Sequence, residues 1–182
     1  MPSEELEVLG IVTQRLEESH IPYMVTGSMA MNYYAVPRMT RDIDVVVEIV
    51  VGESDRLCEL FEPDFYVDRD AVRRAIADRG TFNVIHTGFV LKVDFVVRKD
   101  SDYRREEFSR RKRVSVEGRD FFIVAPEDLI ISKLDWARDT RSAVQLADVR
   151  NLLASAPALD HAYLRRWIAR LGLDSLYGEV GG

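Results

Sequence analysis

Two carboxylates, Asp42 and Asp44, flank Ile43 at the start of a valine-rich run. Side chains alternate between the two faces of a β-strand, so both acids would point to one side and Ile43 to the core. Acids this close repel one another unless a cation joins them, and carboxylate oxygens are ligands that Mg²⁺ prefers. The spacing predicts a divalent-metal site, with a turn or capping role as the alternative.

A third acid, Asp94, is the only carboxylate in the apolar segment Leu91–Val97. An aspartate in such a strand needs hydrogen-bond donors or a cation. If this strand lies beside the one that carries Asp44, three carboxylates converge, as a two-metal phosphoryl-transfer site requires. A salt bridge from Asp94 to Lys92 or Arg98 is the alternative.

Upstream of the paired acids, a short apolar run ends in Gly27-Ser28. Glycine lets the backbone turn tightly and approach a ligand closely. Ser28 would open a helix, whose free N–H groups and dipole favour phosphate. This pair predicts a phosphate-binding corner next to the metal-binding acids.

The hydrophobic periodicity, turn residues and caps indicate the elements that position these groups. We predict helices over 3–19, Ser28–Ala35, Glu53–Phe61, Asp68–Arg79 and, as an exposed helix, Asp102–Arg111. We predict strands over Tyr23–Thr26 and Asp42–Val51, a hairpin of Phe82–His86 and Phe89–Val97, and a second hairpin of Val114–Val116 and Arg119–Val124. Three more helices follow over about 126–138, 141–154 and 159–171. The fold class is therefore α+β, with strands and helices mixed over 1–125 and a helical region over 126–182.

The composition, 47% hydrophobic and 31% charged, is typical of a soluble globular protein. No apolar run is long enough to cross a bilayer, and the acidic N-terminus has no signal-like apolar core, so we expect a cytoplasmic protein without a membrane partner. The single cysteine, Cys58, can form no internal disulfide. Three scattered histidines without ligand spacing argue against zinc.

The net charge of −6 argues against nucleic-acid binding by the surface as a whole, although a local basic patch is compatible with it. A basic run over 104–113 is either a patch that follows a phosphate backbone, such as a tRNA acceptor end, or a solvated face. Trp136 and Trp167 occur at helical spacing among apolar residues, which favours core positions. Lys133 and Asp148 are candidates for either surface or functional positions on amphipathic helices.

Gly27-Ser28, Asp42-Ile43-Asp44 and Asp94 together resemble the signature of the nucleotidyltransferase superfamily of the DNA polymerase β type. The segment from Arg38 to Asp44 is similar to that of small bacterial nucleotidyltransferases of the abortive-infection toxin type. In those proteins a segment like Ala125–Leu134 begins the helical region, and a helix like the one with Asp148 closes it. The resemblance covers most of residues 20–154.

The resemblance implies a five-stranded mixed sheet flanked by helices, with the helical region over 126–182 closing one side of a cleft. It also implies a defined set of roles. Asp42 and Asp44 would hold two Mg²⁺ ions, and Asp94 would ligate the catalytic metal and help deprotonate the acceptor. Gly27 and Ser28 would hold the β- and γ-phosphates of a nucleoside triphosphate (NTP), and Lys133 would reach a phosphate across the cleft.

The leading hypothesis is a nucleotidyltransferase that moves a nucleoside monophosphate (NMP) to a hydroxyl of a protein, a tRNA 3′ end or a small molecule such as an aminoglycoside. A catalytically silent binding protein, such as a toxin–antitoxin component, is the second hypothesis. An Mg²⁺-dependent phosphohydrolase is the third. The sequence does not specify the base preference, the acceptor or the oligomeric state.

Overall fold

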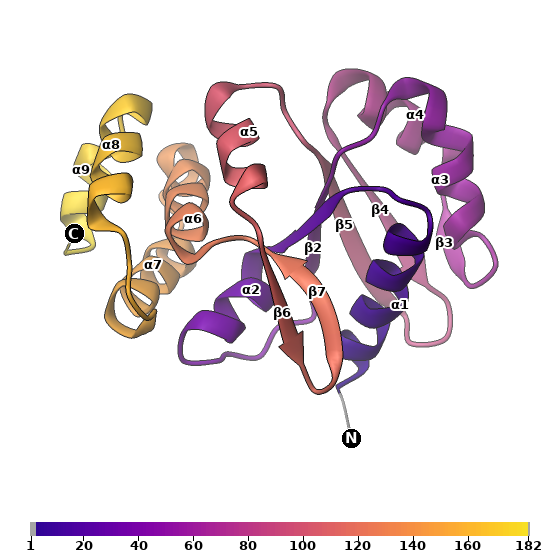
Figure 1. The fold of residues 1–182 in the computed structure, drawn as a ribbon, viewed down its shortest axis with the longest axis horizontal. Helices are drawn as coiled ribbons and strands as arrows, with labels where there is room; N and C mark the ends of the chain where they lie inside the picture. Colours follow the sequence, from indigo (N-terminus) through magenta and orange to yellow (C-terminus); the bar gives the residue numbers. More distant parts are fainter. Residues whose placement is uncertain (1–2, 182) are drawn as a thin grey trace.

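A computed structural model describes residues 3–181 as a mixed sheet with helices on one face and at one end (Figure 1). In chain order the elements are α1 (Glu4–Glu18), β1 (Tyr23–Thr26), α2 (Gly27–Tyr34), β2 (Ile43–Val47), η1 (Val51–Glu53), α3 (Ser54–Phe61), β3 (Phe65–Val67), α4 (Arg69–Asp78), β4 (Thr81–His86), β5 (Leu91–Val97), α5 (Asp102–Ser109), β6 (Lys112–Val116), β7 (Arg119–Ile123), α6 (Pro126–Thr140), α7 (Ala143–Ser155), α8 (His161–Leu171) and α9 (Asp174–Glu179). Residues 1, 2 and 182, which the predicted ranges 1–125 and 126–182 include, lie outside the described residues.

The sheet has the strand order β3-β4-β5-β2-β1-β7-β6. β2 and β5 are parallel at its centre, as are β1 and β7, and the other pairs are antiparallel. The predicted α+β class is confirmed. The described part of the chain contains seven strands, so the five-stranded sheet that the resemblance implied is too small.

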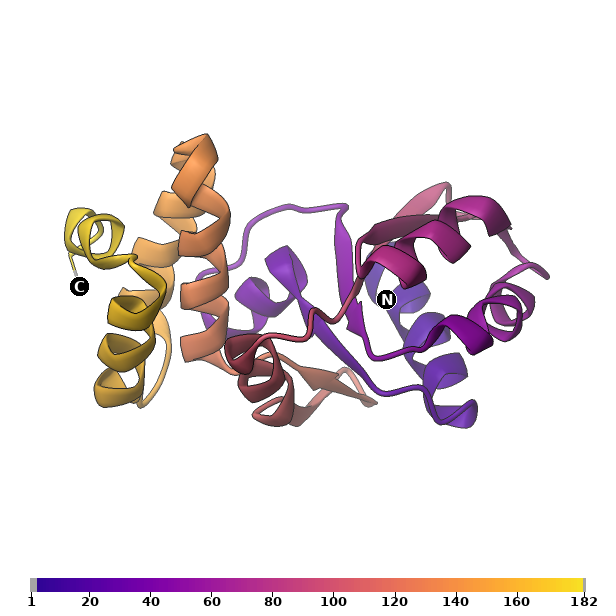
Figure 2. The same cartoon turned by 90° about the horizontal axis from the view of Figure 1, so that it is seen from above.

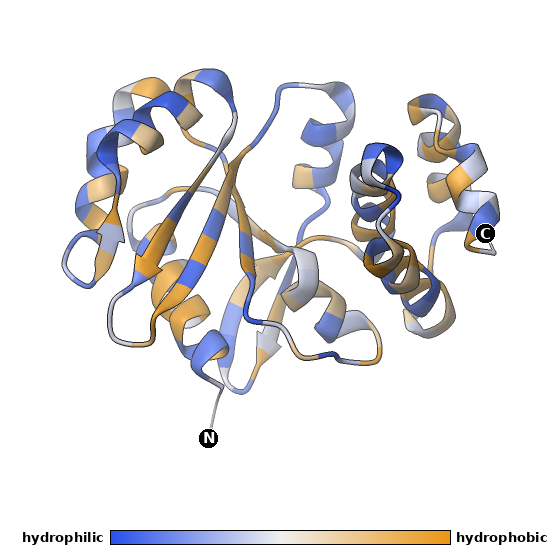
Figure 3. Ribbon diagram, turned by 180° about the vertical axis from the view of Figure 1, so that it is seen from behind, coloured by the Kyte–Doolittle hydropathy of each residue, from blue (hydrophilic) through white to orange (hydrophobic). Residues whose placement is uncertain are grey.

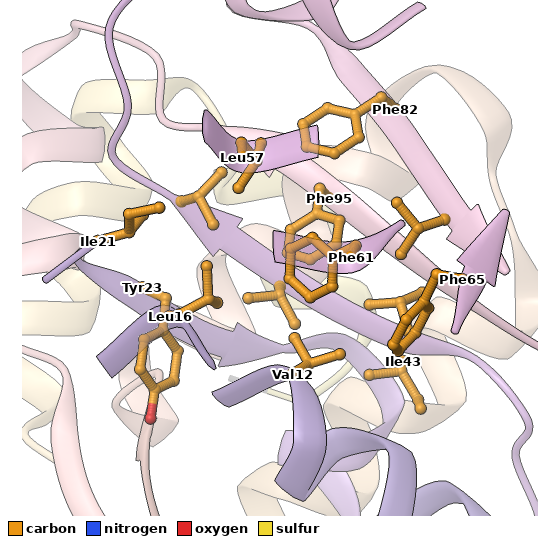
Figure 4. Close-up of a cluster of buried hydrophobic side chains, with 14 of the residues drawn as sticks. Val12, Leu16, Ile21, Tyr23, Ile43, Leu57, Phe61, Phe65, Phe82 and Phe95 are labelled. Atoms are coloured by element: carbon orange, nitrogen blue, oxygen red, sulfur yellow. The ribbon is translucent and has the colours of Figure 1, made fainter. Parts of the chain in front are cut away.

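One face of the sheet is buried, and the other is open over β4 and β5 but covered over β1, where Met24 belongs to a second core. Ile43, Val45 and Val47 alternate with less buried residues along β2 and pack toward α1, α3 and α4. Figure 4 shows this core, in which Phe61 of α3 lies against Phe95 of β5. In Figure 3, β4 and β5 are visible from the opposite face without a helix in front of them. This alternation is the reason that the acids on β2 and β5 reach a solvent-accessible surface.

A second hydrophobic core joins the C-terminal helices to the sheet. Helices α6 to α9 stand at one end of the molecule (Figure 2). Their apolar side chains pack with one another and with residues from earlier elements, among them Met24 of β1, Ala30 of α2 and Tyr103 of α5. Pro126 occupies the first turn of α6, where its missing N–H costs nothing.

Most predicted elements are present, with shifted ends. The strand predicted over Asp42–Val51 is limited to Ile43–Val47, because the Glu48 amide then bonds to Pro22 and the chain enters η1. The hairpins around Thr87-Gly88 and Glu117-Gly118 are confirmed. Three short elements, η1, β3 and α9, were not predicted from the sequence.

Candidate active site

Two carboxylates lie opposite each other on the central strands. The parallel register of β2 and β5 pairs Asp44 with Asp94, and both residues are half-buried on the open face of the sheet. The strand of Asp94 therefore does lie beside the strand of Asp44, which the sequence alone left as a condition.

Asp42 lies in the loop just before β2 and is exposed. Its backbone N–H donates to Oγ1 of Thr40, 3.1 Å away. The strand starts at Ile43, so Asp42 precedes it instead of lying within it as predicted. Asp42 is nevertheless near enough for its charge to act on Asp44.

The pKa of Asp44 reflects its burial and the nearby carboxylates. Burial raises its pKa to about 6, and the negative charges of Asp94 and Asp42 add to the rise. Lys133 and Lys92 oppose it. Crowded carboxylate oxygens are a donor set that fits a hard divalent cation, whose charge would relieve their repulsion.

The acids are not assembled around a metal in this conformation. Within residues 3–181, no group of three or more His, Cys, Asp and Glu side chains is arranged to hold a metal ion. Nζ of Lys92 lies 2.6 Å from Oδ2 of Asp94, so the alternative salt bridge is present. Both side chains of this pair are partly exposed, and an ion pair of that kind is weak enough for a bound cation to displace.

Gly27 allows Asp44 to pack against the backbone of the β1–α2 corner. Its φ is +63°, and a Cβ atom at this position would lie 2.1 Å from Oδ2 of Asp44. Any other residue would therefore be strained and would push the carboxylate away. The glycine predicted for close ligand approach also makes room for the central acid.

A network of side chains connects the phosphate corner with the helical region. The guanidinium of Arg38 donates to Oγ of Ser28 at 2.8 Å and to both carboxylate oxygens of Asp148 at 3.0 Å. Nζ of Lys133 donates to Asp148 at 2.8 Å and to Gln145 at 3.1 Å. Burial opposes ionisation of Asp148, but the bonds from Arg38 and Lys133 outweigh it and lower the pKa of this carboxyl.

Lys133 and Asp148 are therefore not surface residues, because both side chains are only 5% exposed. Asp148 holds the ammonium of Lys133 beside the cleft. Arg38 and Gln145 were missed as site residues. Arg38 belongs to the segment that carries the family resemblance, so its position before Asp42 could have indicated a role in the site. Nothing in the sequence around Gln145 indicates such a role.

The cleft between the sheet and α6 has a volume of about 540 Å³. Gly27, Asp44 and Lys133 line it, and so does Trp136, which is 61% exposed and therefore not the core residue that was predicted. Trp167 is buried, as predicted. Further cationic residues around this cleft are Arg79, Arg98, Lys99, Arg104 and Arg138.

The basic run over 104–113 is mostly engaged in ion pairs within the protein. Arg104 binds Glu107 and Asp135, and Arg110 binds Glu127 and Asp128. These arginines join α5 to α6, so neither interpretation of the run, as a nucleic-acid patch or as a solvated face, describes them.

A second groove of about 810 Å³ lies between α1, α2 and the β6–β7 hairpin. Leu6, Met29 and Tyr33 are among its lining residues. It contains none of the three acids, so the smaller cleft is the candidate active site.

Comparison with solved structures identifies the fold. The antibiotic-resistance factor ANT(2″)-Ia is 15% identical, over 97% of this chain and 94% of that chain, with a TM-score of 0.62. An antigenic nucleotidyltransferase-like protein from Paracoccidioides brasiliensis is 19% identical over 97% and 93%, with a TM-score of 0.56. The lincosamide antibiotic adenylyltransferase LnuA is 11% identical over 84% and 96%, with a TM-score of 0.54.

The chain therefore has the nucleotidyltransferase fold, as the motifs predicted. No protein-family model and no curated protein matches the sequence. Among residues 3–181, no helix combines the length and the apolar character that crossing a membrane requires.

Proposed function

We propose that this protein is a Mg²⁺-dependent nucleotidyltransferase that moves an NMP from an NTP to a hydroxyl and releases pyrophosphate. One observation carries the proposal. Asp44 lines a cleft that also contains Gly27 and Lys133, and the sheet register pairs Asp44 with Asp94 on the neighbouring strand. Because NTPs and Mg²⁺ are abundant in the cytoplasm, we expect the reaction to occur there.

The β- and γ-phosphates would bind between the β1–α2 corner and α6. Gly27 and Ser28 supply backbone N–H groups at the start of α2. An ammonium carries three protons, and Lys133 donates to two acceptors, Gln145 and Asp148, so one proton is left for phosphate. Ser28 is fixed by Arg38, which keeps the corner in place.

Asp42, Asp44 and Asp94 are the residues that would hold the metal. Burial is the main cause of the raised pKa of Asp44, and the further rise from the negative charges of Asp94 and Asp42 supports this assignment. When bound, Mg²⁺ supplies charge neutralisation at the phosphates and lowers the pKa of the acceptor hydroxyl.

The transfer is an in-line substitution at the α-phosphorus. The acceptor oxygen forms a new O–P bond, the bond from the α-phosphorus to the oxygen bridging to the β-phosphate breaks, and pyrophosphate leaves with that electron pair. Asp94 accepts the hydroxyl proton. The residues described above contribute mainly positioning and electrostatic stabilisation.

The in-line geometry indicates where the acceptor binds. The phosphates occupy the α6 side of Asp44, so the acceptor must approach from the opposite side, over β5 and β4. Asn83 is paired with Asp94 in the sheet register, and Ile85 is paired with Tyr66 of β3. Tyr66 is 64% exposed on this open face and offers an aromatic surface to a bound acceptor.

Among acceptor classes, a protein side chain or a small molecule is favoured over a tRNA 3′ end. Arg104 and Arg110, which a tRNA backbone would need, already bind acidic partners inside the protein. One protein with a similar fold is a lincosamide antibiotic adenylyltransferase, which supports a small hydroxylated acceptor such as an aminoglycoside or lincosamide.

The test uses each NTP labelled on the α-phosphate, with Mg²⁺ and either cell extract or a panel of hydroxylated antibiotics. The wild type should transfer the label to an acceptor, and Asp42→Ala/Asp44→Ala should reduce the rate by about 10³-fold or more. Each lost factor of ten corresponds to about 1.4 kcal/mol of transition-state stabilisation. Asp120→Asn, an exposed acid on β7, is the matched control with an unchanged rate. Equal labelling by the double variant would refute the proposal, and release of free phosphate without an acceptor would indicate a phosphohydrolase.

A catalytically silent regulatory protein, such as a toxin–antitoxin component, is the second candidate, and the salt bridge between Lys92 and Asp94 is the observation that favours it. Calorimetric titration with Mg²⁺ separates the two functions. Saturable binding that Asp44→Asn abolishes supports the enzyme, whereas no binding in the presence of NTP supports the silent protein.

A further inference from the structure

Trp136 is the one large aromatic side chain that we assign to the wall of the cleft, and it has no role in the transfer described above. It belongs to α6 and is 61% exposed, whereas Trp167 is 4% exposed. The Trp167 ring contacts Tyr103 and the guanidinium of Arg170. In residues 3–181, no aromatic pair and no cation–π contact involves the Trp136 ring.

The position of Trp136 on α6 relates it to the phosphate site. Leu129, Ser132, Lys133, Trp136 and Thr140 all line the cleft and recur at the spacing of one helix face. Trp136 follows Lys133 by three residues, a rise of about 4.5 Å along the helix. With phosphates at Lys133, the remainder of a nucleotide lying along α6 reaches the indole.

We propose that Trp136 is the stacking platform for the nucleobase of the NTP, an inference that rests on the proposed function. A ring that is exposed, unpartnered and set in the wall of a charged cleft suits a flat heterocycle. Stacking on an aromatic side chain contributes affinity for any base, because every base has a π-face and stacking does not depend on the hydrogen-bonding groups at the edge of the base. The protein should therefore accept several NTPs, and purine nucleotides should bind best because their bases offer the larger face.

The cations around the same cleft are assigned to phosphate and ribose rather than to the base. Arg79 and Arg98 line the wall formed by β4 and β5, opposite α6. With these guanidinium groups assigned to ribose and phosphate oxygens, Trp136 is the cleft residue that is left to contact the base. This placement predicts that removal of the indole weakens binding of the base and leaves binding of the phosphate chain unchanged.

The experiment measures calorimetric binding of Mg²⁺–ATP and of Mg²⁺–tripolyphosphate, which lacks a base, to wild type and to Trp136→Ala. The variant should bind ATP about 5- to 100-fold more weakly, as expected for the loss of one stacked base, and should bind tripolyphosphate like the wild type. Trp136→Phe should retain much of the affinity. In the transfer assay, Trp136→Ala should raise KM for ATP with little change in kcat. Tyr33→Ala is the matched control, since Tyr33 is a 45%-exposed aromatic residue outside this cleft.

Tryptophan fluorescence provides an independent readout, because the chain has two tryptophans and Trp167 is buried. ATP should quench the wild-type emission, tripolyphosphate should not, and Trp136→Phe should lose the quenching. Equal ATP affinity of wild type and Trp136→Ala would overturn the stacking role and leave the proposed function standing. Failure of the wild type to bind either ligand would overturn both.

Discussion

The two walls of the cleft are held in place by different kinds of interaction. On the sheet wall, the backbone register of β2 and β5 sets Asp44 opposite Asp94. On the helical wall, Lys133 is positioned by side chains, through a buried carboxylate on α7 that also binds an arginine from the loop before β2. Backbone hydrogen bonds survive a side-chain substitution, whereas a buried ion-pair network does not. The walls should therefore respond differently to mutation.

The largest stability effect is expected from Asp148→Ala. The substitution removes the carboxylate shared by Lys133 and Arg38 and leaves the buried ammonium of Lys133 without a charged partner. Breaking a buried pair in this way costs about 3–5 kcal/mol of unfolding free energy. Glu179→Ala removes an exposed ion pair with Arg141 and should cost about 1 kcal/mol or less. Urea unfolding measures both variants, and a loss below about 1 kcal/mol for Asp148→Ala would mean that the network does not hold the helical wall.

Much of the sheet wall could be predicted from the sequence, because its residues are close together in the chain. Gly27-Ser28 and the paired acids occur within one stretch, and the β-branched run marked the strand. Asp94 was identified as the only acid in an apolar strand. The strand that pairs with the strand of Asp94 could not be identified, because strand order depends on long-range pairing that single-strand patterns do not encode. The three-residue strand β3 was missed for the same reason, since its pairing with β4 is what defines it as a strand.

The helical wall was harder to predict because its contacts join distant parts of the chain. Arg38 and Asp148 are 110 residues apart, and nothing in either segment indicates that they meet. Arg104 and Arg110 of the 104–113 run were interpreted from their charge alone, while Asp135 and Asp128, which they bind, lie on α6. Trp136 fits the helical pattern of a core residue, but α6 turns it toward the cleft.

Gly27→Ala tests the sheet wall with an effect of intermediate size. The added Cβ would overlap Oδ2 of Asp44 and displace the carboxylate, and a misplacement of about 1 Å at a reacting centre can lower activity about 10²-fold. Gly118→Ala is the matched control: its φ is also positive, at +77°, but nothing lies within 4 Å of the new methyl group. Both variants should lose about 1–2 kcal/mol of stability to backbone strain. Only Gly27→Ala should lose transfer activity, and equal activity of the two variants would contradict the packing role.

The smallest effect concerns the attachment of α6. Asp128 in its first turn is fully buried and accepts hydrogen bonds from Tyr163 and Arg110. Burial raises the pKa of Asp128 from 3.8 to about 6, and these two bonds offset only part of the rise. The native state therefore holds the proton more tightly than the unfolded chain does. This contribution to stability is complete below pH 3.8 and is lost as the pH rises through about 6.

Asp128→Asn removes this titration and leaves an amide that can still accept from Tyr163. Between pH 4.5 and 7, the unfolding free energy of the variant should gain roughly 2 kcal/mol relative to the wild type, because only the wild type must bury a carboxylate that ionises in this range. The fixed cost of removing one of the two carboxylates that bind Arg110 cancels in the comparison between the two pH values, and Glu127 remains its partner in the variant. Urea unfolding of both proteins at each pH measures the difference. An equal difference in unfolding free energy between the two proteins at both pH values would show that Asp128 is ionised over the whole range. The helical wall would then be attached to α5 by a permanent ion pair rather than by a titrating one.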